Sequence, residues 1–180
     1  ELDRGVPDSV IDAMASLSDK AQVHDYAFKT INEAAWVDEE LKNEDSLFEM
    51  EFQKVKASFK VLSKIGDASL IEAVIDRFMS YPKTPDFVAD SIAEYIVDFP
   101  DESTPILIER LEEHQEEGLE GPCEDLLIML TRIGTEEPDD EIYAALRAAF
   151  RYMTNKIYAV ICLADYKDER AIPMFKSYIN

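Results

Sequence analysis

The chain contains few of the residues on which nucleotide-binding and membrane functions depend. Its five glycines stand at positions 5, 66, 118, 121 and 134, too scattered to form a phosphate loop, a dinucleotide fingerprint or a nucleophile elbow. No apolar run approaches the roughly 20 residues that a membrane-spanning helix requires. The sequence therefore predicts neither a membrane protein nor an enzyme of these motif classes.

Cysteine, histidine and tryptophan are also rare, with two, two and one residues. Cys123 and Cys162 form at most one disulfide, and no signal peptide is visible, so we expect reduced thiols in a cytoplasmic protein. His24 has no second ligand at helical spacing. His114 precedes a Glu by three residues, but di-iron helical sites need that arrangement from two helices. We expect no metal and no cofactor.

Basic residues are scarce, since 18 Lys and Arg stand against 39 Asp and Glu and leave a formal charge of −21. A negative field of this size repels phosphate backbones and anionic lipids, which argues against nucleic-acid and membrane partners. Hydrophobic residues make up 47% of the 180 residues, enough for a folded core. We predict a single acidic domain over residues 1–180 with a basic protein partner.

A repeat of about 34 residues organises the chain. Four turn signals start 34, 34 and 33 residues apart, at residues 65–67, 99–101, 133–135 and 166–168. Before each turn, apolar residues recur in one register and at helical spacing, as at Leu62, Ile96, Leu130 and Leu163. A second apolar helical stretch follows each turn. Each repeat is therefore predicted to be a helix hairpin.

The hairpins divide the chain into two predicted regions. Residues 48–180 hold four repeats, of which the third carries a short insertion at residues 136–138 before its second helix. Residues 1–47 are predicted to form a degenerate first unit, with helices over residues 10–17 and 21–36 and an acidic loop over residues 37–46. Because one such hairpin cannot bury its apolar face alone, neighbouring hairpins are expected to stack.

The predicted fold is all-α, a right-handed α-α superhelix (α-solenoid) of about four to five helix hairpins. The segments 64–67 and 168–175 (Lys-Ile-Gly-Asp and Asp-Glu-Arg-Ala-Ile-Pro-Met-Phe) resemble the turn and second helix of HEAT-like repeats of the phycobilin-lyase type. The resemblance covers residues 48–179 and implies a HEAT-like solenoid. Tetratricopeptide repeats have the same period, but the Trp, Gly, Tyr and Pro positions of the tetratricopeptide pattern do not recur in this chain, so that family is the second choice.

Four short polar residues recur one per repeat at the turns, namely Asp67, Asp101, Thr135 and Asp168. These residue types are preferred at helix N-caps, where a side-chain oxygen accepts a hydrogen bond from an unpaired backbone N–H. We therefore interpret them as caps of the second helices rather than as a catalytic or metal-binding cluster.

Charge is unevenly distributed along the chain. Residues 98–141 hold 16 acidic and two basic residues, a net charge of −14, whereas residues 142–180 hold six basic and three acidic residues, a net charge of +3. Solenoids commonly bind partners along the concave surface formed by their second helices. The acidic positions on those predicted helices are the candidate binding residues Glu72, Asp76, Glu109, Glu112, Glu113, Asp140 and Glu141.

The function that these patterns favour is a noncatalytic protein-protein interaction module or scaffold that binds a basic partner through an acidic concave surface. Two alternatives remain open. The family resemblance implies a bilin lyase or a chaperone of chromophore attachment, which would need an apolar groove for the pigment. The acidic charge alone would also suit an antitoxin-like immunity protein that neutralises a basic toxin.

Overall fold

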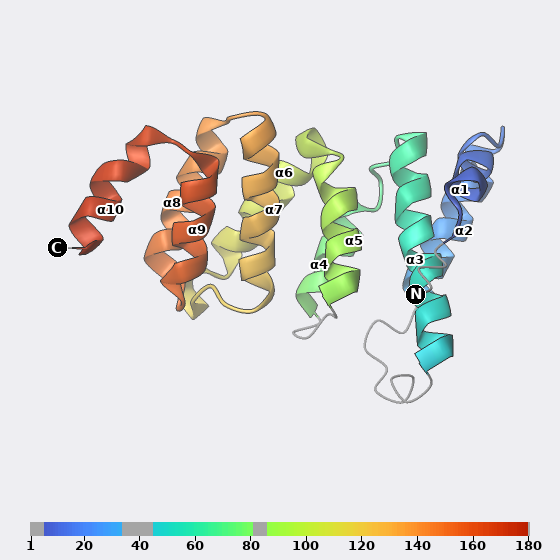
Figure 1. Ribbon diagram of the computed structural model, residues 1–180, viewed down its shortest axis with the longest axis horizontal. Helices are drawn as coiled ribbons and strands as arrows, with labels where there is room; N and C mark the ends of the chain where they lie inside the picture. Colours follow the sequence, from blue (N-terminus) through green and yellow to red (C-terminus); the bar gives the residue numbers. More distant parts are fainter. Residues whose placement is uncertain (1–5, 34–44, 81–85, 180) are drawn as a thin grey trace. The chain divides into compact units, whose positions relative to one another are not determined.

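The computed structural model describes residues 6–33, 45–80 and 86–179, and all regular structure in these segments is helical (Figure 1). The prediction of an all-α fold is confirmed. Within the described segments the one β-type pairing is an isolated bridge between Leu119 and Met153. The helices are α1 Asp8–Ala15, α2 Lys20–Glu33, α3 Asp45–Ile65, α4 Ile71–Ser80, α5 Asp86–Val97, α6 Pro100–Glu113, α7 Pro122–Glu136, α8 Asp140–Tyr152, α9 Lys156–Tyr166 and α10 Ile172–Ile179, with 3-10 turns η2 Gln115–Glu117 and η3 Glu169–Ala171.

The chain forms two compact units, which are described separately. Unit 1 comprises Glu1–Val74 with Lys83–Asp98, and unit 2 comprises Ile75–Pro82 with Phe99–Asn180. Helix α4 contributes its first residues to unit 1 and the rest to unit 2. The prediction of one domain over residues 1–180 stays a prediction.

Unit 1 is built around α3, which packs against α1, α2 and α5. Phe59 and Leu62 on α3 are buried against this core, and the Phe59 ring lies 5.3 Å from the ring of Tyr95 on α5. The Tyr95 hydroxyl donates a hydrogen bond of 2.7 Å to the carbonyl oxygen of Asp67, just after α3. This bond ties α5 to the α3–α4 turn.

Unit 2 is built around α7 and α9, which pack against each other and both against α8, while α6 also packs against α7. Leu107, Leu126, Leu130, Leu146 and Leu163 are 0–1% exposed and form the centre of its core. The apolar register that the repeat predicts thus lies in the core of this unit.

Three of the four predicted turns are present. Helix α3 ends at Ile65, and Gly66 follows with a positive φ of 69°, a conformation that glycine adopts without strain. Helix α5 ends at Val97 and α6 begins at Pro100, so this turn lies at the start of the predicted residues 99–101, and helix α9 ends at Tyr166, the first residue of the predicted turn at 166–168. Each of these three turns links a first helix to a second helix, as expected.

The third predicted turn, at residues 133–135, is wrong. Gly134 is a buried residue inside α7, which continues to Glu136. Glycine is needed there because a Cβ would lie 2.4 Å from Tyr166 Cε2 and 2.9 Å from Ile142 Cγ2. Gly134 therefore allows α8 and α9 to approach α7 closely, and the chain turns at residues 137–139 instead.

Two of the four predicted caps are also wrong. Helix α6 begins at Pro100 after Phe99, without a side-chain cap, and Asp101 lies in its first turn. Thr135 lies inside α7 and donates to the Thr131 carbonyl oxygen, while Asp139 caps α8 through bonds from two backbone N–H groups.

The other two residues accept bonds from backbone N–H groups, but ahead of the predicted helices: Asp67 accepts from Ser69, which precedes α4, and Asp168 caps η3 through Arg170. In the N-terminal region α1 and α2 occupy most of the two predicted helices. Residues 34–44, which include Trp36 and most of the predicted acidic loop, lie outside the described residues.

Candidate functional site

The predicted acidic residues lie on three of the second helices, and all are exposed. Glu72 lies on the part of α4 that belongs to unit 1, so it is not placed relative to the others. The remaining six belong to unit 2, where they are Asp76 on α4, Glu109, Glu112 and Glu113 on α6, and Asp140 and Glu141 on α8.

Three of these carboxylates meet at Arg110 on α6, which sequence reasoning counted only as a scarce basic residue. The Arg110 Nε lies 2.8 Å from Asp76 Oδ1, and its terminal nitrogen Nη1 lies 3.2 Å from Glu109 Oε2 and 3.5 Å from Glu113 Oε2. We call these four residues the Arg110 cluster. Asp76 and Arg110 are 34 residues apart, which equals the repeat period.

The Arg110 cluster presents net negative charge to solvent. The Arg110 side chain is 15% exposed, whereas those of Asp76, Glu109 and Glu113 are 51%, 62% and 55% exposed. The hydrogen bond to Asp76 raises the pKa of Arg110, and the other two carboxylates add to this effect. One positive charge beneath three carboxylates holds them together and leaves two negative charges uncompensated.

A second cluster surrounds Arg170 in the middle of η3. Its guanidinium contacts Asp140 at 2.8 Å and Asp168 at 2.6 Å and lies 4.0 Å from the centre of the Tyr143 ring. The hydrogen bonds from Arg170 lower the pKa of Asp168. Asp140 is therefore engaged with a cation, and Glu141 beside it supplies a backbone N–H to the Asp139 cap.

Further acidic residues crowd the start of α7. Burial raises the pKa of the Glu124 carboxyl, and the like charges of Asp125 and Glu120 raise it further. Burial is the larger cause because it disfavours the charged form, and the two neighbouring like charges act in the same direction. A cation that bound nearby would relieve this repulsion.

In unit 1, His24 on α2 pairs with Asp67 in the α3–α4 turn, with 2.7 Å between Nδ1 and Oδ2. The Ser69 hydroxyl donates to the same carboxylate at 2.6 Å and lies 3.4 Å from the same His24 nitrogen. A serine nucleophile would instead bond the ring nitrogen that faces away from the aspartate. This trio is therefore a structural link rather than a catalytic triad.

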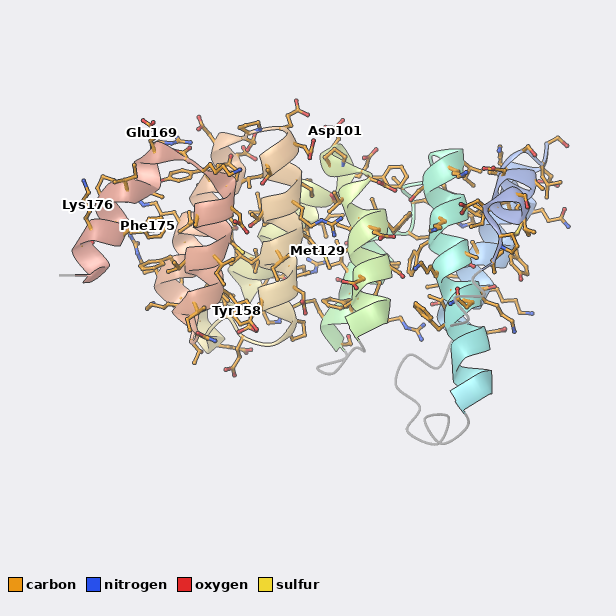
Figure 2. All side chains as sticks on the ribbon, in the orientation of Figure 1. Asp101, Met129, Tyr158, Glu169, Phe175 and Lys176 are labelled. Carbon is orange, nitrogen blue, oxygen red and sulfur yellow. The ribbon has the colours of Figure 1, made fainter. Side chains whose placement is uncertain are left out.

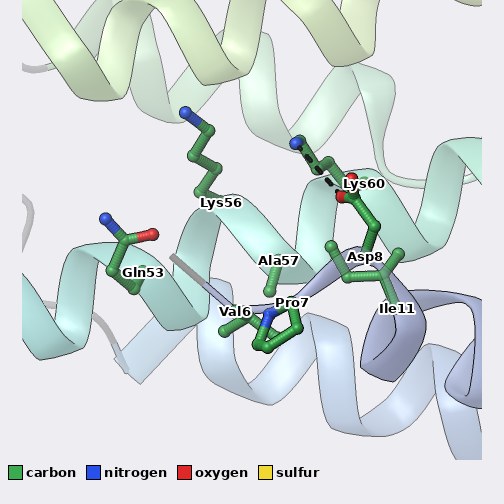
Figure 3. A pocket seen from close by; sticks show the side chains of 8 residues that line it. All are labelled: Val6, Pro7, Asp8, Ile11, Gln53, Lys56, Ala57 and Lys60. Atoms are coloured by element: carbon green, nitrogen blue, oxygen red, sulfur yellow. Dashed lines mark ion pairs between the residues drawn. The ribbon is translucent and has the colours of Figure 1, made fainter. Parts of the chain in front are cut away.

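A small cleft of about 230 Å³ lies between α1 and α3 of unit 1 (Figure 3). Asp8 at its edge pairs with Lys60 at 3.9 Å, and Lys56 points away from this pair (Figure 3). The cleft is smaller than typical ligand pockets of roughly 300–1,000 Å³, and two of its charged residues face each other. It does not form a convincing small-molecule site.

The cysteines are not placed for nucleophilic chemistry. Cys123 and Cys162 are both buried, and burial raises the pKa of each thiol, so neither forms a reactive thiolate readily. Within the described part of the chain, no group of three or more His, Cys, Asp and Glu side chains is arranged to hold a metal ion.

Comparisons with protein-family models, curated proteins and solved structures found no match to this chain. None of the described helices combines the length and the apolar character needed to cross a membrane.

Proposed function

We propose that this protein is a noncatalytic interaction module that binds a basic protein segment through the acidic surface of unit 2. The observation that carries the proposal is the Arg110 cluster, in which one mostly buried arginine holds three exposed carboxylates side by side. Lysine and arginine side chains of a partner would find these acceptors already oriented. The acidic residues Glu120, Glu124 and Asp125 near the start of α7 belong to the same unit and add negative charge to it.

The negative potential acts mainly on the rate of encounter. Exposed charges attract an oppositely charged partner over distances of about 10 Å at moderate salt, and salt screens the attraction. The proposal therefore implies fast, salt-sensitive association with a basic partner. We also propose that the protein is cytoplasmic and that it binds neither nucleic acid nor membrane, since its net charge of −21 disfavours anionic partners.

The arrangement of the hairpins is part of the proposal. We infer that they stack as a HEAT-like right-handed solenoid whose second helices form the binding face. The contact between Asp76 and Arg110 supports this, because it joins equivalent positions of successive second helices, one repeat apart. A crystal structure in which α4, α6 and α8 do not line one face would exclude the arrangement. The chromophore-attachment and immunity alternatives stay predictions.

The test compares two double charge reversals of the same size. Glu109→Lys with Glu113→Lys changes the Arg110 cluster, and Glu136→Lys with Glu137→Lys changes the exposed last residue and C-cap of α7. Stopped-flow fluorescence measures association with a labelled peptide rich in Lys and Arg at low and at physiological ionic strength. We expect the cluster variant to associate about tenfold more slowly at low salt and the control variant to change much less.

Equal slowing by the two variants would mean that only net charge matters, and it would refute a site at the Arg110 cluster. Salt-insensitive association of the parent would refute the proposal as a whole. Circular dichroism of both variants verifies that each retains the helical fold.

A further inference from the structure

A groove of about 420 Å³ lies between α3 and α5 in unit 1, and Asp8 at the start of α1 also lines it. Its volume falls within the roughly 300–1,000 Å³ of typical ligand pockets, unlike that of the smaller cleft between α1 and α3. All of its described lining residues belong to unit 1. The binding proposed for the acidic surface of unit 2 therefore does not use it.

The two walls of the groove carry opposite charges. Lys56, Lys60 and Lys64 follow one another at intervals of four residues on α3 and so lie along one face of that helix. Glu94 and Asp98 have the same spacing on α5. A positive row on α3 thus faces a negative row on α5 across the groove.

The two rows do not pair with each other. Among the described residues, no ion pair joins the α3 lysines to Glu94 or Asp98. Lys60 contacts Asp8 of α1 instead, at a long distance of 3.9 Å, and Lys56 has no ion-pair partner in the described part of the chain. Charged groups on both walls therefore remain available to a ligand.

The groove also holds a hydroxyl group without a bond. Ser63 on α3 lines the groove, and its hydroxyl makes no hydrogen bond to the described residues. A hydroxyl both donates and accepts, so it serves either charged end of a ligand.

Two aromatic side chains form the base of the groove. Phe59 on α3 and Tyr95 on α5 both line it, although they are only 2% and 1% exposed. The Tyr95 hydroxyl is already bonded to the carbonyl oxygen of Asp67, so the base presents ring atoms rather than a polar group. An apolar ligand body would contact these rings.

The balance of charge decides which kind of ligand suits the groove. Among the described residues that line it, three lysines stand against the carboxylates of Asp8, Glu94 and Asp98, so the charges cancel. A simple anion would be attracted by the lysines and repelled by the carboxylates, and a simple cation would meet the reverse. A zwitterion with one charge toward each wall is attracted by both.

We propose that this groove binds a small zwitterion of the α-amino-acid class with an apolar side chain. Its carboxylate lies toward Lys56 and Lys60, whose ammonium groups extend from the same side of α3 (Figure 3). Its ammonium group lies toward Glu94 and Asp98, and its apolar side chain lies on the aromatic base. Such a ligand has about a dozen non-hydrogen atoms, so we expect a dissociation constant on the order of 1 mM.

NMR titration of the full ¹⁵N-labelled chain with L-leucine and L-phenylalanine tests the proposal. Lys60→Gln and Glu94→Gln should each weaken binding about three- to tenfold, because each removes one charge from one wall. Lys176→Gln and Glu169→Gln are the matched controls, since these exposed residues of α10 and η3 belong to unit 2 (Figure 2). Circular dichroism verifies the fold of each variant.

Ligand analogues test the orientation. N-acetyl-L-phenylalanine lacks the ammonium group and L-phenylalaninamide lacks the carboxylate, so at about pH 6 each should bind the parent more weakly than phenylalanine does. Glu94→Gln should not weaken binding of the acetylated ligand further, and Lys60→Gln should not weaken binding of the amide further. The opposite pattern would mean that the ligand lies the other way round, and it would refute the proposed orientation.

Three other results would overturn the proposal. Unchanged α3 and α5 signals with either amino acid at about 10 mM would show that the groove does not bind such a zwitterion. Equal binding of phenylalanine and its acetylated form would indicate an anion site on the lysines alone. Equal effects of the groove and control variants would exclude a defined site. None of these results bears on the charge reversals of the Arg110 cluster, so the two proposals fail separately.

Discussion

Replacing Gly134 with alanine should destabilise the protein, although alanine is the better helix former. Gly134 is buried inside α7, and the added methyl group would stand 2.4 Å from Tyr166 Cε2 and 2.9 Å from Ile142 Cγ2. Both distances are shorter than side-chain carbon atoms tolerate, so the rings and helices around Gly134 must move.

The expected loss follows from three contributions. Alanine in a helix interior gains about 1 kcal/mol over glycine. Overpacking a close-packed core costs about 1–3 kcal/mol. Movement of Tyr166 also breaks two bonds of its hydroxyl with Asp139, of 2.7 and 2.9 Å, which contribute about 1 kcal/mol each. We therefore expect Gly134→Ala to lower the free energy of unfolding by about 2–4 kcal/mol.

Urea denaturation followed by circular dichroism measures this loss, and a double-mutant cycle identifies its cause. Tyr166→Leu removes the ring atom nearest to the new methyl group, so Gly134→Ala should cost much less in that background. A loss below about 0.5 kcal/mol in the parent would refute the close approach, because typical surface substitutions have effects of that size. An equal loss in both backgrounds would show that Tyr166 is not the obstacle.

Two further predictions concern the helix starts. Partial burial would raise the pKa of Asp67, but hydrogen bonds from Ser69 and His24 outweigh it and lower that pKa below its usual range of about 3.8. The ionised Asp67 therefore stabilises the fold above about pH 4, and this stabilisation is lost as the pH falls further. Between pH 5 and pH 2 the parent should lose more stability than Asp67→Asn, as measured by urea titrations. Asp139→Ala removes the α8 cap and should lower the stability of the fold by about 1 kcal/mol. Thr135→Ala should lower it by less than about 0.5 kcal/mol, because Thr135 caps no helix. Thermal unfolding measures both losses, and equal losses would contradict this assignment.

The sequence predicted the helical class and three turns because local signals determine them. Gly66 stands at a helix end and adopts a positive φ, as a turn glycine should. Gly134 carries the same local signal and lies inside a helix instead, because the constraint on it comes from Tyr166, 32 positions away. Contacts between distant residues leave no mark in a short window of sequence.

The candidate site was predictable as a set of charges but not as an arrangement. Acidic positions on the second helices could be read from the chain, whereas the grouping of Asp76, Glu109 and Glu113 depends on how α4 faces α6. One signal was present, since Asp76 and Arg110 are opposite charges separated by one repeat. A search for charge pairs at the repeat period would have identified Arg110.

The Arg110 cluster also has a consequence for the entropy of binding. A free glutamate side chain samples many rotamers, and immobilising such a side chain in an interface costs about 0.5–1.5 kcal/mol. Arg110 already restrains Asp76, Glu109 and Glu113 through contacts of 2.8–3.5 Å. Part of the ordering that a partner would otherwise impose is thus completed during folding. Arg110→Met should consequently make peptide binding less favourable in entropy, even though the substitution makes the surface more negative.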